Sequence, residues 1–154
     1  MIVAMHVATG AAGGAVVRSR LGAALLGLVL HAAGDRMPHE DIGSRRFEIG
    51  SGVFGVLALM AVRGPFDPAT VGAVAAAAPD VEHVVRLPRP GGRKLFPSHR
   101  IAGFHRPGGV PAQTQLVIAG LLLGAVLGAG LRRGRGEPAE AGVELVRDDR
   151  SVPQ

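Results

Sequence analysis

The chain contains no cysteine, tryptophan or tyrosine, and its aromatic content consists of five phenylalanines. Without cysteine there are no disulfides and no thiolate ligands, so a bound metal would have to be held by His, Asp or Glu. The absence of Trp and Tyr removes the aromatic belt that usually marks a membrane interface. The first residues also lack the positive region of a secretory signal, and we interpret residues 2–17 as a retained helix.

Acidic residues are missing from a long interval, between Glu82 and Glu137. The same interval carries nine basic residues, namely Arg86, Arg89, Arg93, Lys94, Arg100, Arg106, Arg132, Arg133 and Arg135. Such a field favours phosphates or anionic lipid headgroups, and for the last three residues a juxtamembrane anchor is the simplest interpretation. The sequence has neither a Gly-x-x-x-x-Gly-Lys-Ser/Thr phosphate loop nor a Gly-x-Ser-x-Gly elbow, and the glycines of residues 10–14 are typical of helix packing.

What the sequence does contain is small and apolar: 47% of its residues are hydrophobic, 24 are glycine, and the mean hydropathy is +0.31. Small residues allow close helix–helix approach in lipid. Five apolar stretches are present, at residues 2–17, 21–33, 49–62, 70–85 and 115–131, and only the last approaches the usual length of a membrane span. We therefore predict an all-α, membrane-embedded bundle of four to five short helices, with a long Pro/Gly loop at residues 86–114 before the last helix. Residues 1–131 form the expected metal-binding domain, and residues 132–154 an expected disordered tail, first basic and then of mixed charge.

The histidines and several carboxylates fall into four clusters along this pattern. They are His6; His31 and Asp35 with His39, Glu40 and Asp41; Asp80, Glu82 and His83; and His99 with His105. In an up-and-down bundle all four clusters lie at one end, whereas Arg18, Arg20, Arg63 and the arginines of residues 132–135 lie at the other. The sequence thus predicts one shared metal site.

Spacing suggests a role for each cluster. His31 and Asp35 are four residues apart and would share a helical face, where they can hold one ion. Asp80 and His83 are three apart, and either Asp80 or Glu82 could take a proton from water while the other binds metal. The alternatives are ordinary ones: a capped helix end and solvated acidic loop around residues 35–41, a helix cap or surface carboxylate at Asp80, and solvated loop histidines in the last cluster.

The loop cluster has the repeated pattern His99-Arg100 and His105-Arg106. This pattern would bring two imidazoles to the metal and two guanidiniums to a phosphate, which arginine can bind in a bidentate manner. Our predicted metal ligands are therefore His6, His31, Asp35, His39, Asp80, His83, His99 and His105. Asp80 and Glu82 are the predicted catalytic residues, and Arg100 and Arg106 the predicted substrate-binding residues.

These residues resemble the inner-membrane-associated metal-dependent hydrolases of the LexA-binding, YdjM-like family, which look related to the zinc-dependent phospholipase C and P1 nuclease fold. The matching pieces are Met5-His6-Val7-Ala8-Thr9-Gly10, the segment His31 to Asp41, and Pro79-Asp80-Val81-Glu82-His83. The resemblance covers about residues 1–130 and implies a helical membrane protein whose His and Asp side chains bind divalent metal. Glu82 stands where the family commonly has Asp, and the His99 to His105 segment is one residue longer than the family pattern and lacks its Thr.

Together these observations predict a membrane-bound, multi-pass metal-dependent hydrolase. We expect zinc, with manganese or iron as alternatives, and a phosphoester substrate such as a phospholipid. The expected partners are membrane lipid and this substrate, with no nucleic acid, and the count of basic residues at the two ends places the site toward the cytoplasm. The alternative function is a non-catalytic metal-binding or metal-transporting membrane protein, and a soluble helical metalloprotein is a third possibility.

Overall fold

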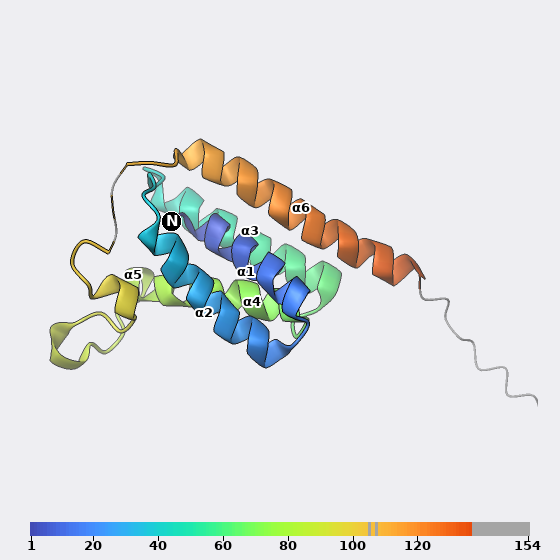
Figure 1. The fold of residues 1–154 in the computed structure, drawn as a ribbon, viewed down its shortest axis with the longest axis horizontal. Coiled ribbons are helices and arrows are strands. Elements are labelled where there is room, and N and C mark those ends of the chain that lie inside the picture. The colour runs from blue at the N-terminus through green and yellow to red at the C-terminus, as the bar shows by residue number, and fades with distance from the viewer. Residues whose placement is uncertain (105, 107, 137–154) are drawn as a thin grey trace, which may run out of the picture.

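Five helices of ten or more residues form the fold in a computed structural model that describes residues 1–104, 106 and 108–136 (Figure 1). They are α1 (Val3–Val17), α2 (Arg20–Arg36), α3 (Arg45–Arg63), α4 (Pro68–Ala77) and α6 (Ala112–Gly136). Short helical turns lie between α4 and α6: η1 (Ala78–Asp80), α5 (Val81–Val84), η2 (Pro90–Gly92) and η3 (Pro97–His99). The described residues contain no strand, so the all-α prediction is confirmed.

The helix ends follow local sequence chemistry. The Ser19 and Ser44 hydroxyls cap the starts of α2 and α3, and Asp67 caps α4 ahead of a proline at its first position. Met37 is extended before Pro38, and α2 accordingly ends one residue earlier. The last helix continues to Gly136, five residues past the expected end at residue 131, because arginine favours helix. The arginines of residues 132–135 are therefore helical, and the rest of the predicted tail, residues 137–154, lies outside the described residues.

Helix α1 lies at the centre and contacts each of α2, α3, α4 and α6. Its contact with α4 depends on glycine: a Cβ on Gly10 would lie 2.3 Å from the Gly72 carbonyl oxygen, and one on Gly14 would lie 2.1 Å from that of Pro68. Gly27 of α2 approaches the same Gly72 carbonyl. The glycines of residues 10–14 thus serve helix packing, as predicted.

The long helices run up and down, so their starts and ends alternate between two ends of the bundle (Figure 1). The start of α1, the end of α2, the turn after α4 and the following loop all lie at the end where α6 begins. A short parallel bridge between His39 and Val110 ties the end of that loop to the segment after α2. The fold therefore brings the predicted clusters to one end.

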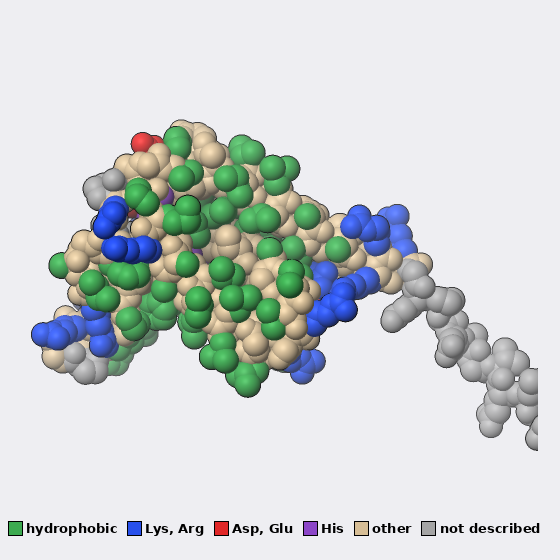
Figure 2. All heavy atoms as spheres, viewed as in Figure 1, with side chains coloured by type: hydrophobic (Ala, Val, Ile, Leu, Met, Phe, Trp, Pro, Cys, Tyr) green, Lys and Arg blue, Asp and Glu red, His purple; other side chains and the backbone are tan. Residues whose placement is uncertain are grey.

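One helix, Ala112–Arg135 of α6, is long and apolar enough to span a membrane, with a mean hydropathy of 2.0 over its best window and 17% of that window buried. Large apolar side chains are also exposed on the other helices, for example Leu21 on α2 and Phe54 on α3, which is 74% exposed. Figure 2 shows apolar side chains across the face of the bundle, with Lys and Arg side chains gathered toward its two ends. By length and composition, the described residues contain one candidate span rather than the several that a multi-pass protein requires.

Candidate metal centre

Three histidine rings converge on one carboxylate at the end of α2. The carboxylate of Asp35 lies 3.0 Å from His31 Nε2, 3.3 Å from His99 Nε2 and 3.3 Å from His6 Nε2. All four side chains are almost completely buried. His31 and Asp35 share a face of α2, as their spacing predicts, whereas the other two rings come from the start of α1 and from η3.

Hydrogen bonds on the far side of two rings fix where their protons sit. His31 Nδ1 donates to the carbonyl of Ala76, 2.8 Å away, and His99 Nδ1 donates to the carboxylate of Glu82. Because both acceptors lack a proton, each ring carries one on Nδ1 and directs Nε2 toward the centre. The two Nε2 atoms lie 3.3 Å apart. Two such nitrogens beside a carboxylate attract a cation, and metal-binding histidines are usually oriented by second hydrogen bonds of this type.

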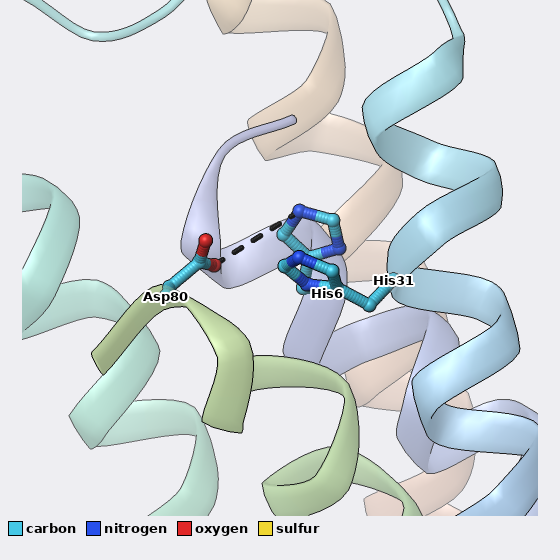
Figure 3. A group of neighbouring side chains, drawn as sticks. All are labelled: His6, His31 and Asp80. Carbon is cyan, nitrogen blue, oxygen red and sulfur yellow. Dashed lines mark ion pairs between the residues drawn. The ribbon is translucent and has the colours of Figure 1, made fainter. Parts of the chain in front are cut away.

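Asp80 adds a second carboxylate, which η1 presents toward the rings of His6 and His31 (Figure 3). The two rings are stacked with their centroids 4.2 Å apart, and Asp80 Oδ2 lies 4.0 Å from His6 Nε2. His6 Nδ1 and Asp80 Oδ2 are buried without a hydrogen-bond partner among the described residues, and His6 Nε2 has only its ion-pair contacts with Asp35 and Asp80. Buried polar atoms of this kind are costly unless a ligand or water satisfies them.

The cluster as a whole fits a divalent metal. Within the described part of the chain, three overlapping groups have ligand atoms within 4.8 Å of one another: His6, His31 and Asp80; His31, Asp35 and His99; and Asp80, His83 and His99. Imidazole nitrogens combined with carboxylate oxygens suit zinc, manganese or iron. The donor set and the unpartnered buried atoms therefore both agree with a metal site.

The surroundings shift the pKa values of three groups in the centre. Burial raises the pKa of Asp80 to about 6, so its carboxyl exchanges a proton near neutral pH. Burial also acts to raise the pKa of Glu82, but hydrogen bonds from His99 and from two backbone N–H groups of the loop outweigh it and hold that pKa below its usual range. For His99, burial lowers the pKa, but hydrogen bonds to Asp35 and Glu82 raise it by more. The proton that the ring gains in the metal-free protein therefore lies on Nε2 beside Asp35, and a bound metal would displace it. Glu82 is thus the fixed anion, and Asp80 the carboxyl that can gain or lose a proton.

The structure brings six of the eight predicted metal ligands into these groups. His39 lies outside them: its Nδ1 donates to the Met37 carbonyl, and its Nε2 lies beside Asp41 and the Met1 amino group. His105 lies outside the described residues.

The described hydrogen bonds of the two arginines predicted to bind substrate lie outside the centre. Arg100 is exposed and its Nε donates to the carbonyl of Lys94. Arg106 is also exposed, and its backbone carbonyl accepts a hydrogen bond from the backbone of His39. Among the described contacts, their place after His99 and His105 in the sequence therefore does not bring either arginine to the cluster.

Several residues that the sequence analysis did not assign contact the centre directly. The Ser98 hydroxyl donates to Asp35 at 2.7 Å. Arg45, at the start of α3, donates to the His83 carbonyl, and Lys94 Nζ lies 3.3 Å from His83 Nδ1. Arg45 has no local pattern that links it to His83, since the two residues are 38 positions apart and only the fold brings them together. Lys94 could have been singled out as the only lysine in the chain.

Comparison of the chain with protein-family models, with curated proteins and with solved structures finds no match. The function is therefore argued from the centre itself.

Proposed function

We propose that the protein is a metal-dependent hydrolase of phosphoesters that acts at a membrane surface. The observation that carries this proposal is the pair of Nε2 atoms of His31 and His99, which face each other across Asp35 with their protons held on the opposite side of each ring. The neighbouring unpartnered atoms of His6 and Asp80 support it. Five side chains of the centre would hold the metal, those of His6, His31, Asp35, His83 and His99, with Asp80 beside them.

A divalent metal bound there would supply Lewis-acid activation of water at neutral pH. In the hydrolysis of a phosphoester the water oxygen joins phosphorus, one P–O bond breaks, one proton goes to the leaving oxygen and the other goes to a base. Asp80 is our candidate for that base, because its pKa lies near 6 and its side chain is 19% exposed at the edge of the cluster. Glu82, which the sequence offered as the alternative base, instead positions His99.

The cations beside the centre suit a phosphate. Arg45 and Lys94 both contact His83, and Arg89 donates to the Glu82 carbonyl at 3.1 Å. Their charge would offset that of a phosphate group placed next to Asp80. In this proposal they take the role that the sequence assigned to Arg100 and Arg106.

Membrane attachment in this proposal begins with α6, the candidate span. The exposed apolar faces of α2 and α3 support deeper embedding, because a soluble protein rarely exposes so much contiguous apolar surface. The basic residues at the two ends would then lie at headgroup level, with the metal centre facing one of the two membrane surfaces.

The alternative is a non-catalytic metal-binding or metal-transporting protein. Transport requires ligands at several depths along a pathway. In the described part of the chain the candidate ligand groups gather at one end, which favours the hydrolase.

Metal content and turnover test the proposal together. Detergent-purified wild type, His31→Ala and Asp80→Ala are analysed by metal mass spectrometry and assayed with methyl p-nitrophenyl phosphate, with Glu40→Gln, whose side chain is exposed, as the control. We expect stoichiometric metal and metal-dependent release of p-nitrophenol in wild type and control, a loss of both in His31→Ala, and bound metal with strongly reduced turnover in Asp80→Ala. Bound metal without turnover would favour the alternative, whereas a folded protein that takes up no metal would refute both.

A further inference from the structure

An apolar groove leads along the bundle surface to the metal centre. It has a volume of about 410 Å³ and lies between α3 on one side and α4 with α5 on the other, with α1 as its floor. Its lining consists of aliphatic side chains and one glycine, apart from a single polar residue, Asp80. The residues used in the argument below are Val53 of α3, Val74 of α4, Asp80, and Val84 and Val85 beside α5. The groove and the centre thus share the carboxyl that we propose as the base.

We infer that this groove holds the hydrocarbon chain of a lipid phosphoester substrate whose phosphate lies at Asp80. The inference rests on the proposed function and specifies its substrate class. The volume falls within the range of about 300–1,000 Å³ typical of small-ligand sites. A water-soluble phosphoester would leave this apolar surface unused.

The distribution of charge matches an amphiphile that enters in one direction. At the Asp80 end, Arg45 and Lys94 surround His83, which follows three residues later. Away from that end, toward Val74 and Val53, the groove is lined by aliphatic side chains. An anionic headgroup therefore fits at the centre and an alkyl chain fits along the groove.

The groove also opens on the surface that we propose to face lipid. Val53, Val74, Val84 and Val85 are each about half exposed. The exposed side chain of Phe54 lies next to Val53 on α3. A lipid could thus enter from the membrane without first passing through water.

Val74 offers a test because it lies six residues before Asp80, about 9 Å along the helix axis. Val74→Phe places a ring across the groove at this distance. Val117→Phe makes the same substitution on α6, at a site that is 62% exposed and does not line the groove. Far-UV circular dichroism checks that both variants keep their helical content.

Zinc-loaded protein in mixed micelles of fixed composition is assayed with the methyl, octyl and hexadecyl esters of p-nitrophenyl phosphate. Each methylene removed from water is worth about fourfold in binding, so we expect kcat/KM to rise at least tenfold from the methyl to the octyl ester. Val74→Phe should lower the hexadecyl-to-methyl ratio of kcat/KM tenfold or more, and Val117→Phe should leave it as in wild type. Turnover that is independent of chain length would overturn the groove proposal and leave the proposed function standing.

If no ester is hydrolysed, the proposed function is refuted but the groove proposal is not. A binding experiment then tests whether the groove holds an alkyl chain. Because the chain has no tryptophan, single-tryptophan variants report without background. Hexadecyl phosphate, but not methyl phosphate, should shift the emission of Val85→Trp in the groove and leave that of Leu121→Trp, on the exposed face of α6, unchanged. Equal shifts at both sites would show general lipid partitioning, and no shift at Val85→Trp would show an empty groove; either result overturns the inference.

Discussion

The variant Glu82→Gln gives the most direct test of the centre, because it keeps the size of the side chain and changes only its charge and hydrogen bonding. The Glu82 carboxylate accepts from His99 Nδ1 and from the backbone N–H groups of Leu95 and Phe96. A glutamine amide at the same position has one acceptor oxygen and presents its NH2 group to at least one of these donors.

Two effects follow from this mismatch. One buried donor loses its acceptor, which costs about 1–3 kcal/mol of stability. The His99 ring also loses the anion that fixes its proton on Nδ1, and loss of such an outer partner typically reduces metal affinity 10–100-fold, or about 1.4–2.7 kcal/mol. We therefore expect a folded variant that binds zinc with an affinity one to two orders of magnitude lower.

Competition with a chromophoric chelator, at fixed pH in detergent, measures this change in Kd. Glu40→Gln is the matched control, since the Glu40 side chain is exposed. A Glu82→Gln protein that keeps its helical content and has the wild-type Kd would show that Glu82 does not orient a metal ligand. The argument from the His31 and His99 tautomers would then fail.

Three further predictions concern stability, each measured by thermal unfolding. First, the pKa of Asp80 is raised from 3.8 to about 6, so the folded state holds this proton more tightly than the unfolded state does. The free energy of unfolding of the metal-free protein should therefore fall by up to about 3 kcal/mol as the pH rises from 4 to above 6. Asp80→Asn should be more stable than wild type at pH 7 but not at pH 4. Second, Gly72→Ala places a Cβ 2.3 Å from a carbonyl oxygen of α1 and should lower the free energy of unfolding by at least about 1–3 kcal/mol. The control Gly124→Ala, with nothing within 4 Å of the new Cβ, should be neutral or stabilising. Equal effects of the two substitutions would contradict the close packing of α1 and α4. Third, Asp67→Ala removes both the cap of α4 and the ion-pair partner of the buried Arg63 guanidinium, and should lower the free energy of unfolding by at least about 2 kcal/mol. Asp67→Asn can still cap α4 and should restore the part of this loss that is due to the cap.

The sequence predicts the helices and the location of the centre well, because both depend on short-range patterns. Pro38 and Ser19 mark helix boundaries locally, and the i, i+4 spacing of His31 and Asp35 survives in the folded protein. Alternation of helix direction then gathers the clusters at one end. No long-range information is needed for these inferences.

The roles within the centre depend on the loop, which local patterns do not determine. In one continuous α-helix Glu82 would point away from Asp80, but the chain changes to a 3-10 turn at η1, and η3 brings His99 against Glu82. The loop conformation is set by distant backbone contacts such as that of Val110 with Pro38. Pairing each histidine with the arginine that follows it therefore did not indicate Arg45 and Lys94, which contact His83 in the folded protein.

The central position of α1 has a consequence for the order in which the protein is assembled. During synthesis α1 emerges before α2, α3, α4 and α6, which later surround it. The apolar surface of α1 and the ring of His6 therefore have no packing partners when they are made, and the centre can form only after the ribosome has added His99. Before α2, α3 and α4 are made, the apolar surface of α1 is exposed, and such surface favours aggregation, so lipid or a chaperone that shields α1 early would increase the yield of folded protein.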